Sequence, residues 1–182
     1  TVTSYFKKQE QLDKLTDLIC YYSMVDKRNQ LWIATDNGVN IYNPVRDEFS
    51  YINKNNGLPS DQVVSMIEDN YGDVWVGTRN GLACVSSNVN KETGKISYRV
   101  ISFDEKDGLV GSIFNQNAVY KDNKGHLYFG CTNGYTEFDP RKIRFNTVVP
   151  KPKFTDLYIG NELVETGKEY RNHLILDESL TH

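Results

Sequence analysis

The chain has 182 residues, of which 21 are basic and 24 acidic, with a formal net charge of −3 and a sequence pI near 5.6. The sequence has no basic patch and no Lys/Arg run interleaved with aromatic residues, so nothing in it supports nucleic-acid binding. It also has no run of 18 apolar residues, and we expect no segment of it to span a membrane.

Residues 1–16 are predicted to form a β-strand and its exit loop, because the repeats that follow require a strand-to-strand connection here. A short helix is the alternative, since Lys, Glu, Gln and Leu in KKQEQLDKL all favour helix. The chain begins without Met or a signal peptide and stops abruptly, which leads us to expect a piece of a longer protein.

One frame then recurs three times: an Asp, an aromatic residue six positions later, and a Gly six positions after the aromatic. The three copies are Asp26–Trp32–Gly38, Asp69–Trp75–Gly81 and Asp122–Tyr128–Gly134. Three copies with two fixed gaps are improbable by chance, so the sequence indicates a repeat architecture.

Each copy predicts three short strands joined by turns. In the second copy the apolar runs VVSMIED, VWVGT and LACV are separated by NYGD and RNG. Asn-Gly accepts the positive φ that tight hairpin turns require. A fourth strand follows as EFSYIN at 48–53 and ISYRVISF at 96–103, and the aromatic residues are 43 and 53 residues apart. Four short antiparallel strands per repeat of this length are typical of β-propeller blades.

The residues after the third repeat change character. Pro150 and Pro152 each fix φ and predict a short, stiff joint. KFTDLYIGNELV then predicts a hairpin that turns at Gly160 and Asn161 and opens a β-sandwich. About 30 residues remain, fewer than the roughly 100 of a complete sandwich.

GLPSDQVVSMIEDNYGDVWVGTRNGL resembles the two-component-regulator propeller repeat found in the sensor regions of hybrid two-component systems of gut Bacteroidetes. NQNAVYKDNKGHLYFGCTNGYTEFDPRKI resembles the last blade of those sensors, and PKPKFTDLYIGNELV resembles the start of the Ig-like sandwich that follows. The chain departs from the repeat at Cys131, where the other copies have Thr35 and Thr78, and at Tyr128 in place of Trp.

The predicted fold class is therefore all-β: a partial β-propeller of about three four-stranded blades, followed by the beginning of an Ig-like β-sandwich. The expected segments are the last strand of a preceding blade (1–16), a blade (17–57), a second blade (58–108), the last blade (109–148), and the linker with the first strands of a truncated sandwich (149–182). Three blades cannot close a ring of 4 to 8, so we expect further blades upstream and self-association of this chain through its open faces.

The candidate chemical groups favour no catalytic or metal site, and we expect no cofactor. Cys20, Cys84 and Cys131 are predicted to be buried free thiols, with a disulfide or metal site as the alternative. The three His residues (126, 173 and 182) are poor candidates for a catalytic base. The Asp-rich turns lack the alternating carboxylates and bidentate Glu of a calcium loop, so each Asp is predicted to cap its own turn. The similar Asp-box of sialidase propellers is one residue shorter.

The structural residues of the frame are Trp32, Gly38, Trp75, Gly81, Tyr128 and Gly134. We expect the aromatic residues among them to pack between blades, although stacking on sugars is an alternative. Ligand contact is expected where the second-to-third-strand turns and the connections between blades gather on one face. The candidates there are Asn37, Gln62, Arg79, Asn80, Asn115, Gln116 and Asn133, a set suited to carbohydrate hydroxyls.

The resemblance implies a periplasmic sensor segment of a hybrid two-component histidine kinase, with a poly- or oligosaccharide ligand. It implies a sensor dimer and a membrane contact only through a helix downstream of this sequence. The alternatives are a glycan-cleaving propeller, which would need a convergent acid and nucleophile, and a non-enzymatic protein-interaction scaffold.

Overall fold

The computed structural model describes residues 15–143 and two short strands at 157–159 and 162–164. The chain divides into two compact units, Thr1–Arg144 and Phe145–His182. The predicted first strand or helix at the amino terminus and the joint at Pro150 and Pro152 lie outside the described residues. Within the described ranges no helix has the length and hydropathy of a membrane span.

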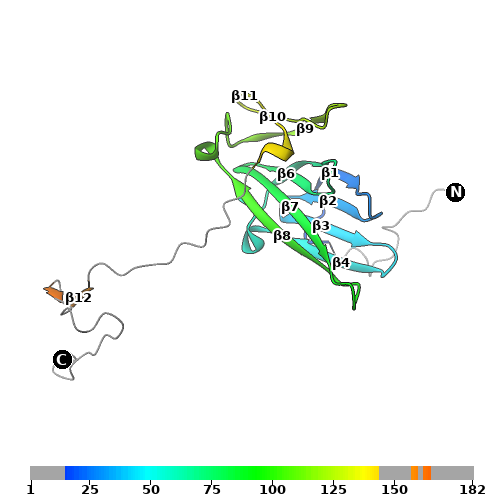
Figure 1. Ribbon diagram of the computed structural model, residues 1–182, viewed down its shortest axis with the longest axis horizontal. Coiled ribbons are helices and arrows are strands. Elements are labelled where there is room, and N and C mark those ends of the chain that lie inside the picture. Colours follow the sequence, from blue (N-terminus) through cyan, green and yellow to red (C-terminus); the bar gives the residue numbers. More distant parts are fainter. Residues whose placement is uncertain (1–14, 144–156, 160–161, 165–182) are drawn as a thin grey trace, which may run out of the picture. The chain divides into compact units, whose positions relative to one another are not determined.

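Three antiparallel sheets make up the described part of the first unit, and each follows the chain order of its strands (Figure 1). Blade 1 consists of β1 (Cys20–Val25), β2 (Leu31–Thr35), β3 (Gly38–Asn43) and β4 (Glu48–Ile52); blade 2 of β5 (Val63–Glu68), β6 (Val74–Thr78), β7 (Gly81–Val89) and β8 (Ile96–Phe103); and blade 3 of β9 (Phe114–Lys121), β10 (Leu127–Cys131) and β11 (Gly134–Phe138).

The first strands of the three blades lie next to one another. Strand β5 contacts both β1 and β9, and β1 also contacts β9. The later strands of each sheet therefore extend away from a shared inner region, as in a propeller. The all-β expectation and the propeller-blade architecture are confirmed, because the described residues contain strands and short 3-10 turns but no α-helix.

Three strands are present in the described residues of blade 3, and residues 144–148, at the end of the expected blade, lie outside the described residues. After β11, Asp139 caps the short turn η3 (Pro140–Lys142) by accepting a hydrogen bond from the backbone N–H of Arg141 at 3.1 Å. Pro140 stands at the start of this turn and has no N–H to offer a sheet ladder. The chain therefore leaves the sheet at this point.

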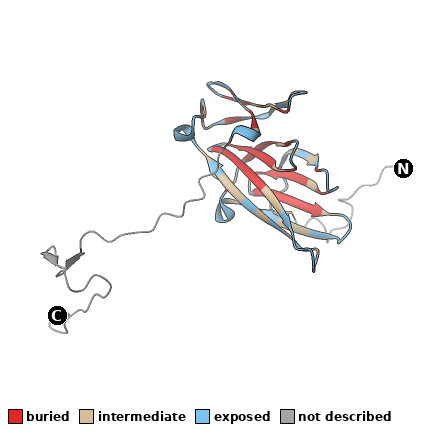
Figure 2. Cartoon of the chain, viewed as in Figure 1, coloured by how far each residue is buried: buried red, intermediate tan, exposed pale blue. Residues whose placement is uncertain are grey.

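Two apolar interfaces hold the three blades together, and blade 2 contributes to both. Side chains of successive residues in a strand point to opposite faces of the sheet. Val74 and Val76 of β6 accordingly belong to the cluster with Trp32 of blade 1, whereas Trp75 belongs to the cluster with Phe114 and Phe129 of blade 3. Figure 2 shows the buried residues concentrated on the middle strands of the blades.

The connections between blades are alike. Turns η1 (Lys54–Asn56) and η2 (Glu105–Asp107) each have a capping box and end at a left-handed glycine. The frame glycines Gly38 and Gly81 also have positive φ, and an added Cβ would lie 2.3 Å and 2.7 Å from backbone carbonyl oxygens of the same blade. These positions require glycine both for conformation and for space.

In the second unit, β12 (Leu157–Ile159) pairs antiparallel with β13 (Glu162–Val164). Leu157 lies opposite Val164, as expected for a hairpin centred on residues 160–161. The Ig-like identity of this unit stays a prediction, because the rest of it lies outside the described residues.

Candidate functional site

The Asp and Trp of the repeated frame form a brace within each of the first two blades. In blade 2, Asp69 Oδ1 accepts the backbone N–H groups of Tyr71 (2.8 Å) and Asp73 (3.1 Å), and its Oδ2 accepts Trp75 Nε1–H at 3.0 Å. In blade 1, Asp26 Oδ2 accepts Trp32 Nε1–H in the same way, at 3.1 Å. The six-residue spacing therefore has a physical cause: one carboxylate caps the turn and also fixes the indole across it.

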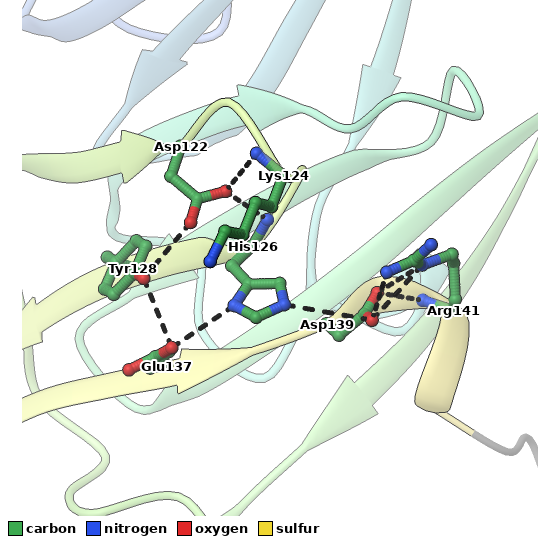
Figure 3. A network of polar contacts seen from close by, with 7 residues as sticks. All are labelled: Asp122, Lys124, His126, Tyr128, Glu137, Asp139 and Arg141. Atoms are coloured by element: carbon green, nitrogen blue, oxygen red, sulfur yellow. Dashed lines mark hydrogen bonds and ion pairs between the residues drawn. The ribbon is translucent and has the colours of Figure 1, made fainter.

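Blade 3 keeps the turn cap but changes the rest of the brace (Figure 3). Asp122 Oδ1 accepts the N–H groups of Lys124 and His126, both at 2.8 Å, while the Tyr128 hydroxyl lies 3.4 Å from Asp122 Oδ2. The same hydroxyl donates to Glu137 Oε1 at 3.2 Å. His126 Nδ1 lies 3.3 Å from that Glu137 oxygen, so the network extends across the sheet.

The braces explain why the Asp-rich turns are structural. The Asp carboxylates are used by the N–H groups of their own turns and by the aromatic side chain. Within residues 15–143 and the two later strands, no group of three or more His, Cys, Asp or Glu is placed to hold a metal ion.

At the other end of the strands, the hairpin turns and the connections between blades meet. The Gly38 N–H donates to Asp61 O and the Gly81 N–H to Ser112 O, both at 2.7 Å. The Arg79 N–H donates to Gln62 O at 3.0 Å. Each β-hairpin turn is therefore tied to the loop that precedes or follows its blade.

The first strand of every blade also has a bulge near this end. In blade 1, Tyr21 is the extra residue between the pairs Cys20–Thr35 and Tyr22–Ala34. In blade 3 the bulge is larger: residues 115–118 stand opposite Gly130, and Asn117 has a φ of 57°. Bulges re-aim side chains away from the sheet ladder and are common near functional sites.

Side chains from all three blades meet around these bulges, and we refer to Tyr21, Asp36, Gln62, Arg79 and Gln116 as the polar cluster. The Tyr21 hydroxyl donates to Asp36 Oδ2 at 2.7 Å, and Gln62 Nε2 donates to Asp36 Oδ1 at 3.1 Å. Arg79 Nη1 donates to the carbonyl of Phe114 in blade 3 at 3.3 Å. Gln116 Nε2 donates to the Tyr21 carbonyl at 3.2 Å, which links blade 3 to blade 1.

The charges of the cluster are coupled. The hydrogen bond to Asp36 raises the pKa of Tyr21, while the positive charge of Arg79 opposes this rise. The Tyr21 phenol is therefore neutral at physiological pH and donates its hydrogen bond to the Asp36 carboxylate.

All seven side chains expected to contact a ligand are exposed. Three of them, Gln62, Arg79 and Gln116, lie in the polar cluster. Asn37 donates instead to the carbonyl of Thr16 at 3.2 Å. Asn80, Asn115 and Asn133 belong to the same turns and bulge, and Asn133 accepts a hydrogen bond from Thr132 Oγ1 at 3.4 Å.

Sequence reasoning missed Tyr21 as a member of this site. The signal for a bulge lies in pairing register, and register depends on partners that one segment of sequence does not identify. In blade 3 a partial signal exists: Phe114 precedes Asp122 by eight residues, whereas Cys20 and Val63 precede their Asp by six.

The three cysteines are free thiols, as expected, but Cys20 is exposed and not buried. Cys20 is the first residue of β1, and the two residues that follow it are less exposed. Burial raises the pKa of Cys84 to about 12, so that thiol is inert. Tyr128, expected to pack between blades, is half-exposed on the face of blade 3 that no described blade covers.

Comparisons with known proteins agree with this fold. The model of the "Two component regulator propeller" family matches residues 57–80. "Histidine kinase P4" of Formosa agariphila is 32% identical over 114 residues, which are 63% of this chain and 8% of that protein. These matches confirm the resemblance seen in the sequence.

Solved structures of B. thetaiotaomicron sensors share the fold. The extracellular domain of the hybrid two component system BT3049 matches with a TM-score of 0.60 and 21% identity, over 87% of this chain and 22% of that one. Two structures of the extracellular domain of BT4673, described as a one component system in one and a hybrid two component system in the other, match with a TM-score of 0.54 and 23% identity over 91% of this chain and 21% of theirs. The chain thus spans about a fifth of these solved chains.

Proposed function

We propose that this chain, whose repeats are those of the two-component regulator propeller, is part of the extracytoplasmic sensor of a hybrid two-component histidine kinase. It contributes to binding a poly- or oligosaccharide and turns nothing over. The observation that carries this proposal is the convergence of Tyr21, Asp36, Gln62, Arg79 and Gln116 from three blades at one end of the strands.

The chemistry of the polar cluster suits sugar hydroxyls, which both donate and accept hydrogen bonds. Amide groups of Gln62 and Gln116 and the neighbouring bulge residue Asn115 offer both functions. A guanidinium has five N–H donors, and the Arg79 contact to Phe114 O uses one of them. The phenol of Tyr21 adds an aromatic surface beside these groups.

Location and partners are part of the same proposal. The solved relatives are extracellular domains of two-component sensors, and the curated relative is a histidine kinase. Both support a periplasmic position for this chain, with kinase activity and membrane attachment in other parts of the longer protein. The sensor would act as a dimer.

The test is calorimetric titration of the chain with a panel of polysaccharides and their oligosaccharides. For a ligand that binds, Arg79→Ala and Gln62→Ala are each expected to raise Kd about tenfold, which corresponds to ~1.4 kcal/mol. Lys124→Ala is the matched control, because Lys124 is an exposed residue of the β9–β10 turn at the opposite end of the strands.

Three results would contradict the proposal. If neither cluster variant changes the Kd, the ligand site lies elsewhere on the chain. Release of reducing ends from any polysaccharide of the panel would favour a glycan-cleaving propeller. Binding of a protein and of no glycan would favour the interaction scaffold.

A further inference from the structure

Negative charge exceeds positive charge around the polar cluster. Asp36 and Arg79 are its two charged members, and Asp17 and Asp61 lie on the segments that lead into β1 and β5. The Asp61 carbonyl accepts the Gly38 N–H at 2.7 Å, which places Asp61 beside the turn that carries Asp36. A ligand in contact with the cluster therefore meets several carboxylates and one guanidinium.

The ionisation of Tyr21 reports the same balance. The hydrogen bond to Asp36 has the largest part in raising the pKa of Tyr21, the charge of Asp17 adds to the rise, and the charge of Arg79 opposes it. Two negative charges and one positive charge thus act on the Tyr21 hydroxyl. Arg79 also directs Nη1 to the carbonyl of Phe114 at 3.3 Å, so part of the guanidinium faces the backbone of blade 3.

The connections between blades at this end of the strands do not reverse the sign. The connection at 53–62 carries one charge of each sign, Lys54 and Asp61. The connection at 104–113 carries three acidic residues and one basic residue: Asp104, Glu105, Asp107 and Lys106. The field over this end of the described blades is therefore negative, and it acts on any charged ligand that approaches.

Asp36 combines its charge with acceptor capacity. An ionised carboxylate only accepts hydrogen bonds and has about four lone-pair sites. The Tyr21 hydroxyl uses one site on Oδ2, at 2.7 Å, and Gln62 uses one on Oδ1, at 3.1 Å. The Asp36 side chain is partly exposed, so its other sites face ligand or solvent. Sugar hydroxyls are suitable donors, and a hydrogen bond to a charged acceptor is roughly twice as strong as a neutral one.

We propose, on the basis of the glycan-binding function given above, that the polar cluster selects glycans without acidic groups and that Asp36 determines this selectivity. Asp36 accepts hydrogen bonds from sugar hydroxyls, while Gln62 and Arg79 donate to others. A uronic acid or a sulfate ester is ionised at neutral pH and has no proton to give to Asp36. Its charge is repelled by Asp36 and Asp17, and like charges placed together are a common means of excluding a wrong ligand.

The test is calorimetric titration of the full chain with pairs of oligosaccharides that differ only in charge, such as oligogalacturonides and their methyl esters, added to the panel above. At low ionic strength the neutral member is expected to bind about tenfold more tightly, because each of two carboxylates about 6 Å from the ligand charge contributes about threefold. Salt at about 0.5 M is expected to narrow this difference by screening the repulsion, without changing the Kd of the neutral member.

Two variants separate the charge from the hydrogen bonds. Asp36→Asn keeps the shape and one acceptor oxygen, and it is expected to weaken the neutral member and to reduce the preference to about threefold or less. Asp17→Asn retains an oxygen that can accept the Ile19 N–H, now bound at 2.9 Å. It is expected to lower the Kd of the acidic member about threefold and to leave that of the neutral member unchanged. Glu92→Gln, in the β7–β8 loop at the other end of the strands, is the control and changes neither.

The outcomes distinguish this selectivity from glycan binding itself. Acidic members that bind as tightly as their neutral partners would overturn the selectivity and leave the glycan function in place. A full preference in Asp36→Asn would overturn the role of Asp36. If Asp36→Asn does not fold, Asp17→Asn and the salt dependence decide the question. No binding by any member of the panel would overturn the glycan function and the selectivity together.

Discussion

Blades 2 and 3 carry the same Asp–aromatic–Gly frame but use its aromatic residue differently. Trp75 is 2% exposed and its indole N–H is held by a buried Asp69. Tyr128 is half-exposed, and its hydroxyl is shared between Asp122 and Glu137. The turn cap is the same in both blades, so the frame specifies the turn while the neighbouring blade determines what the aromatic residue does.

The cross-strand neighbours differ accordingly. Trp75 stands opposite Ile67 and Cys84, whereas Tyr128 stands opposite Tyr120 and Glu137. The Tyr120 and Tyr128 rings are 6.2 Å apart, and Tyr120 is 61% exposed. The outer face of blade 3 is therefore aromatic and acidic, unlike the apolar faces that join blades 1, 2 and 3.

The difference between blades 2 and 3 is tested most directly by removing each of the two aromatic side chains in a separate variant. Trp75→Ala is expected to destabilise the chain by about 3–5 kcal/mol, because it empties the centre of the second interface. Tyr128→Ala is expected to have a much smaller effect, since its ring is partly in water. Denaturant unfolding followed by circular dichroism measures both, and equal losses would contradict the distinction.

The Asp residues give the next largest contrast. Asp69→Ala leaves the Trp75 Nε1–H buried without its acceptor, which is expected to lower the free energy of unfolding by about 1–3 kcal/mol. Asp122→Ala should matter less, because the Tyr128 hydroxyl keeps Glu137 and solvent as partners. The measurement is again the unfolding midpoint, and a larger loss for Asp122→Ala would reverse the interpretation.

Much of this fold is predictable because its determinants are local. The alternation of VWVGT and LACV, the Asn-Gly turns and the self-capping Asp act within a few residues of one another. The polar cluster is less predictable, because it depends on bulges in β1 and β9 and on contacts such as Gln116 to Tyr21, 95 residues apart.

Beyond the Tyr128 network lies an ion pair that can be tested by pH. Arg141 donates to both oxygens of Asp139, at 2.9 Å and 2.8 Å, and this lowers the pKa of Asp139 to about 2. The pair therefore stabilises the fold fully above pH about 4, the ordinary Asp value, and loses this contribution as the pH falls towards 2. Arg141→Ala is expected to raise the pKa of Asp139 in a carboxyl-carbon NMR titration. Lys142→Ala, its exposed neighbour, should leave that pKa unchanged.

The smallest expected effect concerns the tyrosine that replaces tryptophan in the frame. Removal from water, followed by the hydrogen bond to Glu137, raises the pKa of Tyr128 to about 12. Because the folded value lies above the ordinary value of about 10, the neutral phenol contributes stability below pH 10 that is lost between pH 10 and 12.

Glu137→Gln removes the negative charge beside the hydroxyl and keeps the side-chain length. It is expected to lower the pKa of Tyr128 only part of the way towards 10, since the desolvation of the ring remains. The titration of the Tyr ζ-carbon in the labelled protein measures this, with Glu92→Gln in the exposed β7–β8 loop as the control. A Tyr128 pKa that does not move would mean that Glu137 is not its hydrogen-bond partner in solution. The Tyr128 hydroxyl would then have Asp122, at 3.4 Å, as its partner in blade 3.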